Sequence, residues 1–122
     1  MIRILLVDDH ASFRQPLAFM LGREPDLEVI GQAGSLAEAR QLLDDADLAL
    51  IDLDLPDGDG VDFIVDLAAT NPHTTALVLT GSACPNHHAR AMAAGAAEVL
   101  PKSVTIDDVI HAVRRLRPDG RG

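Results

Sequence analysis

The sequence predicts an α/β fold built on an open, doubly wound parallel sheet with helices on both faces. Five short apolar runs alternate with five amphipathic stretches along the 122 residues. Such alternation is typical of parallel strands joined by crossover helices. Five strand–helix pairs are too few to close an eight-stranded barrel, so an open sheet is expected. In open sheets of this kind, ligands bind beyond the carboxyl ends of the strands.

Four of the predicted strands are apolar at nearly every position, which is the pattern of parallel strands buried on both faces. They lie at 2–7, 48–53, 76–79 and 96–100. The fifth, at 27–33, is weaker and more polar. We therefore expect it at an edge of the sheet.

The intervening helices have recognisable starts and apolar faces. Ser35 with Glu38, and Thr105 with Asp108, have the spacing of residues that cap a helix start. The helix expected after Gly60 has an apolar stripe at helical spacing, made of Val61, Ile64, Val65 and Ala68.

Two helices are less regular. The first carries Phe13, Leu17, Met20 and Leu21 at helical spacing, but Pro16 predicts a shifted start or a distorted first turn. The fourth is short, rich in alanine and bracketed by Pro85 and Gly95. Just after Pro85 come His87 and His88, which we expect to be solvated loop side chains rather than metal ligands.

Composition limits the classes of function. The hydrophobic fraction of 48% supports a real core, and the length fits a single domain. The net charge of −9 argues against direct nucleic-acid binding by this domain. No apolar run approaches the roughly 20 residues of a membrane span, and the N-terminus does not have the pattern of a signal peptide. Cys84 is the only cysteine, so a cytoplasmic location is expected.

The residues that end the predicted strands form one chemical set. Asp8 and Asp9 end the first strand, Asp52 ends the third, Thr80 the fourth and Lys102 the fifth. Carboxylates gathered at one sheet edge need a cation between them, and hard oxygen ligands favour Mg²⁺. Asp52 would then be a carboxylate nucleophile toward phosphorus. Lys102, the chain's only lysine, would pair with a phosphoryl oxygen, and Thr80 would donate a hydrogen bond to another.

Each of these residues also has a simpler explanation. An aspartate after a strand often caps the next helix, and threonine and lysine are common in turns. The hypothesis of one site depends on the coincidence of all four strand ends at the edge where ligands bind.

Longer motifs carry a resemblance to a known family. They are Ile4-Leu5-Leu6-Val7-Asp8-Asp9-His10, the stretch from Leu50 to Gly60, Val78-Leu79-Thr80-Gly81, Gly95-Ala96 and Leu100-Pro101-Lys102. In this order and spacing, the chain resembles response-regulator receiver domains, in particular the LuxR/NarL-type subfamily. The resemblance covers residues 1–117, and 118–122 have the pattern of a linker or C-terminal tail. It implies a flavodoxin-like five-stranded sheet of order 2-1-3-4-5 with five helices.

The resemblance also implies the role of each site residue. Asp52 would be the phosphoacceptor, with a sensor histidine kinase as donor. Mg²⁺ would be bound by Asp8, Asp9, Asp52 and the backbone carbonyl of Asp54. Thr80 and Lys102 would bind the phosphoryl group and respond to it, while Asp54 and Ser82 would tune its hydrolysis. The output would be transcription, through a C-terminal DNA-binding domain outside this chain. A homodimer would form through the face of helix 4, strand 5 and helix 5, or through helices 1 and 5.

Two residues depart from the family pattern. Receivers usually have Tyr or Phe three residues before the lysine, where this chain has Val99. Valine has too few rotamers and too little reach to report the state of Thr80. Pro101 lacks the N–H of a strand residue, so the fifth strand is expected to fray there.

Two other functions remain open on the sequence alone. Val99 favours an atypical receiver that acts as an interaction or dimerisation module without phosphorylation. The pair Asp52 and Asp54 resembles the nucleophile and acid of haloacid-dehalogenase phosphohydrolases. That pair normally ends the first strand, however, and the chain is short for such an enzyme, so a phosphoacceptor rather than a multiple-turnover enzyme is expected.

Overall fold

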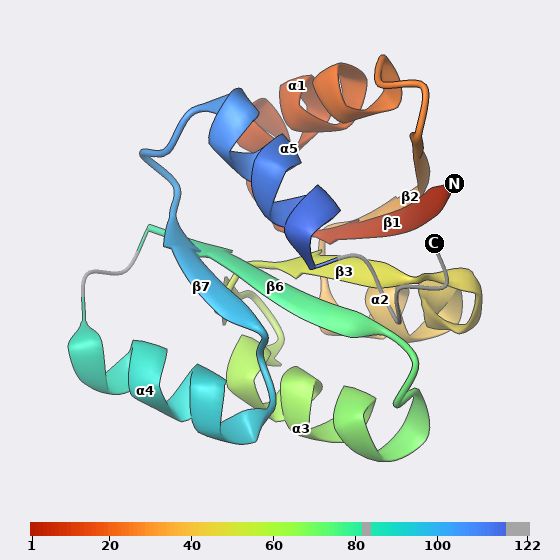
Figure 1. Cartoon of the computed structure of the whole chain (residues 1–122). Coiled ribbons are helices and arrows are strands. Elements are labelled where there is room, and N and C mark those ends of the chain that lie inside the picture. The colour runs from red at the N-terminus through yellow and green to blue at the C-terminus, as the bar shows by residue number, and fades with distance from the viewer. Residues whose placement is uncertain (82–83, 117–122) are drawn as a thin grey trace.

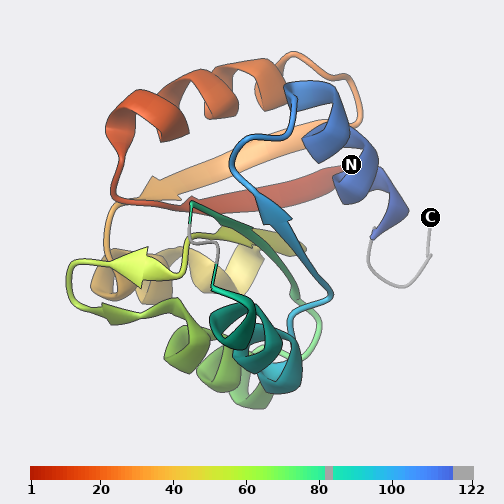
Figure 2. The ribbon, with the colours of Figure 1, turned by 90° about the vertical axis from the view of Figure 1, so that its left-hand side faces the viewer.

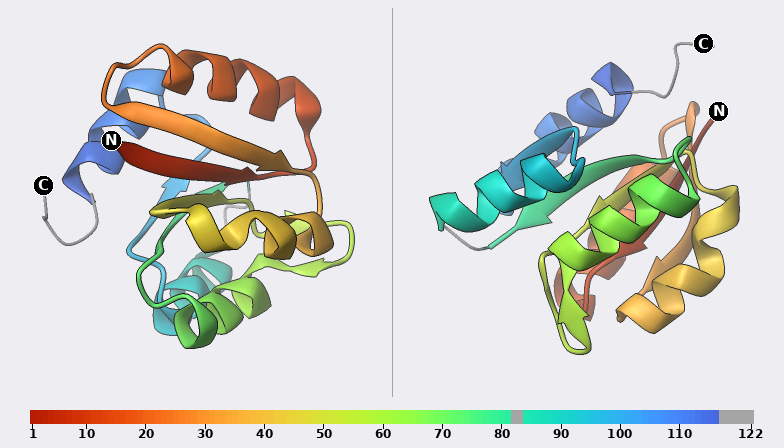
Figure 3. Two further views of the ribbon diagram at one scale, coloured as in Figure 1. Left: turned by 90° about the vertical axis from the view of Figure 1, so that its right-hand side faces the viewer. Right: turned by 90° about the horizontal axis from the view of Figure 1, so that it is seen from below.

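The computed structural model describes residues 1–81 and 84–116 and consists of three layers (Figure 1). A parallel sheet of five strands lies in the middle, in the order β2-β1-β3-β6-β7. Helices α1 and α5 cover one face, and α2, α3 and α4 cover the other, as the two views of Figure 3 show. The fold predicted from the sequence is confirmed. The fourth and fifth strands are labelled β6 and β7 because a short hairpin, β4–β5, precedes them.

The strands of the sheet are close to their predicted positions. Their bounds are β1 Ile2–Val7, β2 Leu27–Ala33, β3 Leu48–Ile51, β6 Thr75–Thr80 and β7 Glu98–Pro101. The hairpin consists of β4 Asp54–Leu55 and β5 Gly58–Asp59. The more polar β2 lies at an edge, as its composition predicted.

The helices occupy the connections between strands. Their bounds are α1 Ala11–Gly22, α2 Leu36–Leu42, the 3₁₀ turn η1 Leu43–Asp45, α3 Gly60–Thr70, α4 Pro85–Ala94 and α5 Ile106–Arg115. Both predicted caps are present. The Ser35 hydroxyl accepts a hydrogen bond from the Glu38 N–H, and Thr105 and Asp108 form a full capping box.

Alternate residues of the strands contribute to two apolar layers, since successive strand side chains point to opposite faces. Ile4 and Leu6 of β1 pack with α1 and α5, whereas Leu5 and Val7 pack with α2, α3 and α4. The central strands are therefore buried on both sides, which explains their continuous apolar sequence.

Two local expectations are corrected. In α3, Val65 is 52% exposed, and Phe63, which was left out of the predicted stripe, is fully buried. The start of α1, by contrast, needs no correction: the helix begins at Ala11 with His10 as its N-cap, and Pro16 lies inside it at the cost of one backbone hydrogen bond.

The second correction concerns Pro101. This residue pairs with Thr80, and the next N–H, that of Lys102, donates to the Thr80 carbonyl at 2.9 Å. Strand β7 is at the sheet edge, where the missing N–H of Pro101 faces away from β6 and costs no ladder bond. The expectation of a frayed end was wrong.

No helix among the described residues is long and apolar enough to cross a membrane.

Gly60, the first residue of α3, fixes how closely that helix start approaches β3. A Cβ at Gly60 would lie 2.6 Å from the Asp52 carbonyl oxygen and 2.9 Å from the Leu53 Cα. Both neighbours are backbone, so they cannot rotate away. Gly60→Ala is therefore expected to lower the free energy of unfolding by about 2 kcal/mol or more, measured by urea denaturation.

Gly22 provides the matched control, because a Cβ there would meet nothing within 4 Å. Gly22→Ala lies at the end of α1 and is expected to raise stability by about 0.5–1 kcal/mol. Equal effects of the two substitutions would contradict the close approach at Gly60.

Candidate functional site

Backbone hydrogen bonds place the predicted site residues at one edge of the sheet. The Asp8 N–H donates to the Ala33 carbonyl at 2.9 Å, and the Asp52 N–H donates to the Val7 carbonyl at 2.8 Å. Lys102 is joined to Thr80 in the same way. Each residue thus extends the ladder by one step past its strand, and their side chains project from the carboxyl edge.

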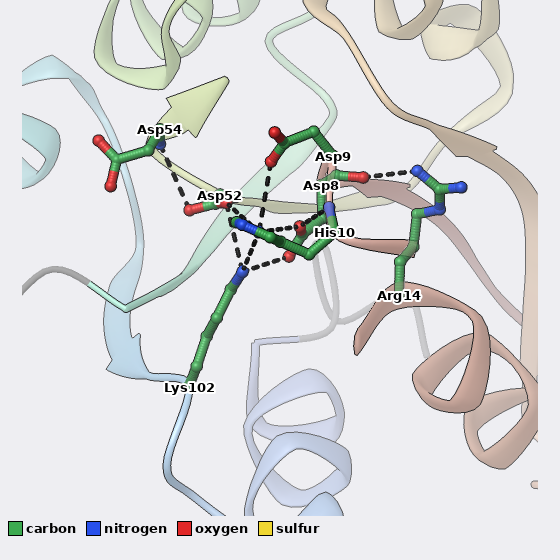
Figure 4. Close-up of polar contacts among 7 residues, drawn as sticks. All are labelled: Asp8, Asp9, His10, Arg14, Asp52, Asp54 and Lys102. Atoms are coloured by element: carbon green, nitrogen blue, oxygen red, sulfur yellow. Dashed lines mark hydrogen bonds and ion pairs between the residues drawn. The ribbon is translucent and has the colours of Figure 1, made fainter. Parts of the chain in front are cut away.

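Lys102 is the centre of this group (Figure 4). Its Nζ lies 2.7 Å from Asp8 Oδ2 and 3.3 Å from Asp52 Oδ2. The Asp8 and Asp52 side chains are only 9% and 2% exposed. Two carboxylates at such burial repel each other and lose hydration, and the ammonium group offsets part of both costs. Lys102 Nζ also lies 4.7 Å from the centre of the Phe13 ring, a cation–π contact that holds it over the site.

Asp9 and His10 form the outer side of the group. The Asp9 side chain is 34% exposed and that of His10 is 59% exposed. The His10 Nδ1 lies 3.2 Å from Asp8 Oδ1, 3.3 Å from Asp9 Oδ1 and 3.7 Å from Asp52 Oδ2. One ligand atom from each of these four residues lies within 4.8 Å of the others. The group is thus buried on its inner side and open to solvent on its outer side.

The electrostatics of Asp52 follow from this arrangement. Burial raises the pKa of the Asp52 carboxyl above its usual value, and the Asp8 carboxylate acts in the same direction, while Lys102 opposes both. Burial by itself would lower the pKa of Lys102, but its bonds to Asp8 and Asp52 outweigh burial and raise the pKa above the usual value. Lys102 therefore remains a cation at neutral pH.

The loop after β3 contacts Asp52 directly. The Asp54 N–H donates to Asp52 Oδ1 at 3.3 Å, so both oxygens of the Asp52 carboxylate have partners. The Asp54 carboxylate is turned away from the group (Figure 4) and is exposed. The backbone of Asp54 and not its side chain faces the site.

The remaining predicted residues lie around this group. Thr80 ends β6 and is fully buried next to Lys102 in the ladder. Val99, in β7, is half-buried and packs against the apolar layer of α2, α3 and α4. Ser82 lies outside the described residues.

Three residues that contact this group were not predicted from the sequence as part of the site. They are His10, Phe13 and Arg14, whose Nη1 donates to the Asp8 carbonyl at 2.6 Å. His10 had a detectable signal, because it directly follows Asp8 and Asp9 at the predicted ligand edge. Phe13 and Arg14 gave none, since their approach depends on how α1 packs on the sheet.

Comparison with known proteins identifies the family. Residues 4–114 match the family model of the response regulator receiver domain. The chain belongs to this family.

Individual relatives agree with that assignment. The DNA-binding transcriptional activator DevR/DosR of Mycobacterium tuberculosis is 36% identical over 116 residues, which are 93% of this chain and 54% of that protein. This receiver thus spans about half the length of that relative. The signal receiver domain of the response regulator NarL from Mycobacterium tuberculosis superposes with a TM-score of 0.88 at 28% identity, over 93% of this chain and 94% of that one.

A third comparison concerns a response regulator protein from Burkholderia pseudomallei, described with a phosphorylated aspartic acid, calcium ion and citrate. Its structure gives a TM-score of 0.83 at 28% identity, over 92% of this chain and 66% of that one.

The raised pKa of Asp52 means that its ionised form is less favourable in the folded receiver than in the unfolded chain. Stability is therefore lost as pH rises from the unfolded pKa of Asp52 through the folded one. Asp52→Asn removes this cost and is expected to raise the free energy of unfolding at pH 7. Urea denaturation without added metal measures it.

The gain is expected to shrink in acid, where Asp52 is protonated in both states. Asp62→Asn, an exposed carboxylate in the first turn of α3, is the control and should give no such gain. An Asp52→Asn variant less stable than the wild type at pH 7 would show that the Asp52 charge stabilises the fold.

Proposed function

We propose that this receiver is phosphorylated on Asp52 by a sensor histidine kinase and controls an output, which is transcription. The contact that carries the proposal is that of Lys102 with Asp52 and Asp8, because it places an ammonium group beside a buried carboxylate at the open edge of the sheet. The Burkholderia regulator, with its phosphorylated aspartic acid and calcium ion, supports the same chemistry.

The donor set fits Mg²⁺. Asp8, Asp9 and Asp52 supply three carboxylates within 4.8 Å of one another, and their hard oxygens are the ligands this ion prefers. The Asp54 backbone, which already faces Asp52, would supply a carbonyl oxygen. When bound, the ion neutralises negative charge on the incoming phosphoryl group.

The transfer itself is a single displacement. An Asp52 carboxylate oxygen attacks phosphorus, and the P–N bond of the phosphohistidine breaks as the imidazole of the kinase leaves with the electron pair and takes up a proton. Lys102 exchanges its bond to Asp52 for one to a phosphoryl oxygen and retains Asp8. The Thr80 hydroxyl donates a hydrogen bond to a second phosphoryl oxygen, and Asp54 and Ser82 tune the later hydrolysis. One group is accepted per chain, so the receiver is not a multiple-turnover enzyme.

The output rests on the relatives. DevR/DosR is a DNA-binding transcriptional activator about twice the length of the matched region. We infer that residues 1–117 are the receiver and that 118–122, outside the described residues, belong to a linker or tail toward a DNA-binding domain of the LuxR/NarL type. The receiver would then work in the cytoplasm as a homodimer, through α4, β7 and α5 or through α1 and α5.

A second candidate is a receiver that acts as an interaction module without phosphorylation. Val99 favours it, because this half-buried valine is packed in the core where an aromatic switch residue would swing. If phosphorylation changes neither the oligomeric state by light scattering nor the affinity for a partner, this candidate is supported.

Labelling with a small acyl phosphate tests the main proposal. With Mg²⁺ present, intact-mass measurement is expected to show one added phosphoryl group, which is lost in Asp52→Asn. Lys102→Ala should slow labelling at least about tenfold, because removal of one charge-stabilising donor typically costs that much.

The matched control is again Asp62→Asn, which should label like the wild type. Absence of labelling under conditions that label another receiver would contradict the proposal. Continuous turnover of a phosphate ester would contradict the phosphoacceptor role and favour a phosphohydrolase.

A further inference from the structure

The hairpin β4–β5 is in contact with Asp52 at one end. Asp54 of β4 pairs with Asp59 of β5, and the Asp54 N–H donates to Asp52 Oδ1 at 3.3 Å. Figure 2 shows the hairpin in yellow-green, running out from β3 and returning into α3. A shift of Asp54 is thus passed directly to Asp59, its partner in the ladder.

The second strand of the hairpin, β5, is in contact with α4. Asp59 Oδ1 accepts the Val61 N–H at 2.9 Å as the N-cap of α3 and lies 3.2 Å from His87 Nε2. Asp59 Oδ2 lies 3.6 Å from Arg90 Nη1. The His87 side chain is only 16% exposed, so the expectation of a solvated loop histidine was wrong. Partial burial favours a raised pKa at Asp59, but the Val61 N–H and His87 outweigh it and lower the pKa, which keeps this carboxylate ionised.

The turn of the hairpin is anchored independently. Asp57 Oδ1 accepts the Leu36 N–H at 2.9 Å, and Oδ2 accepts the Ala37 N–H at 3.2 Å, so the turn is fixed to the start of α2. Because the turn is held, movement at Asp54 cannot be absorbed there.

Helix α4 buries few of its side chains. Of its residues, all of which the structure describes, only Ala91 is fully buried. Apolar burial therefore contributes little to its anchoring, so a polar contact at its first turns adds to what holds the helix in place.

We propose that phosphorylation of Asp52 is transmitted to α4 through the hairpin β4–β5 and the contact of Asp59 with His87 and Arg90. This inference rests on the proposed phosphorylation of Asp52. Before transfer the Asp54 N–H donates to Asp52 Oδ1. After transfer the negative charge lies on the phosphoryl oxygens, so the preferred acceptor of this N–H moves, the hairpin shifts with it, and α4 is released. This path does not need an aromatic residue at position 99.

Hydrogen exchange of the full chain tests this, with beryllofluoride and Mg²⁺ as the phosphoryl mimic. In the wild type, the mimic is expected to speed amide exchange across residues 85–94. Without the mimic, His87→Leu should speed amide exchange in α4 by about five- to tenfold, because the contact with Asp59 is absent. Addition of the mimic to this variant should then change the exchange rate little. Arg90→Ala should give at most about a fivefold effect, because its pair is more exposed.

Binding of the mimic gives a second readout. Coupling between two sites is reciprocal, so His87→Leu should bind beryllofluoride more tightly by a factor similar to the gain in exchange. His87→Gln retains an N–H donor near the Nε2 position and should restore wild-type behaviour. His111→Ala, an exposed histidine on α5, is the matched control and should change neither readout.

The outcomes separate this inference from the proposed function. If beryllofluoride binds and stabilises the protein but exchange in α4 does not change, or changes equally in His87→Leu, the inference is overturned and the phosphoacceptor role stands. If beryllofluoride does not bind, both are overturned.

Discussion

The ion pairs of Lys102 with Asp8 and Asp52 hold the carboxyl edge of the sheet together, because two carboxylates are buried there beside each other. Without a cation they would repel and lose hydration at the same time, a combination that is frequent at functional sites. The ammonium group makes the arrangement stable while it leaves Asp52 with a raised pKa. The fold therefore stores unfavourable charge at the carboxyl edge of the sheet, where ligands of such folds bind.

Polar contacts join the carboxyl edge of the sheet to the rest of the molecule on both sides of Asp52. Arg14 of α1 holds the Asp8 carbonyl, and the Asp54 N–H holds the Asp52 carboxylate. Beyond Asp54, the hairpin reaches α2 through Asp57 and α4 through Asp59. A change in the charge of one carboxylate thus has short, continuous routes to helices on the far face of the sheet.

Much of the site was predictable because it depends on topology. Once the sheet is parallel, the residues after each strand meet at one edge, which identifies Asp8, Asp52, Thr80 and Lys102 without any knowledge of helix packing. Three features were not predictable. They are the burial of Phe63 in place of Val65, the harmless position of Pro101 and the contact of His87 with Asp59. Each depends on the direction in which a group points relative to another element.

The sequence by itself determined the five strands and the acidic edge, because hydrophobic periodicity and strand ends are local properties of the chain. The order of the strands in the sheet followed from the resemblance to receiver domains. The sequence also determined that position 99 is a valine and that a single lysine is available at the edge. Only the tertiary structure decided which helix faces meet, that His10 joins the carboxylates, and that the loop after Asp52 contacts α4. The reason is that such contacts are set by the rotation and packing of whole elements, which local patterns leave undetermined.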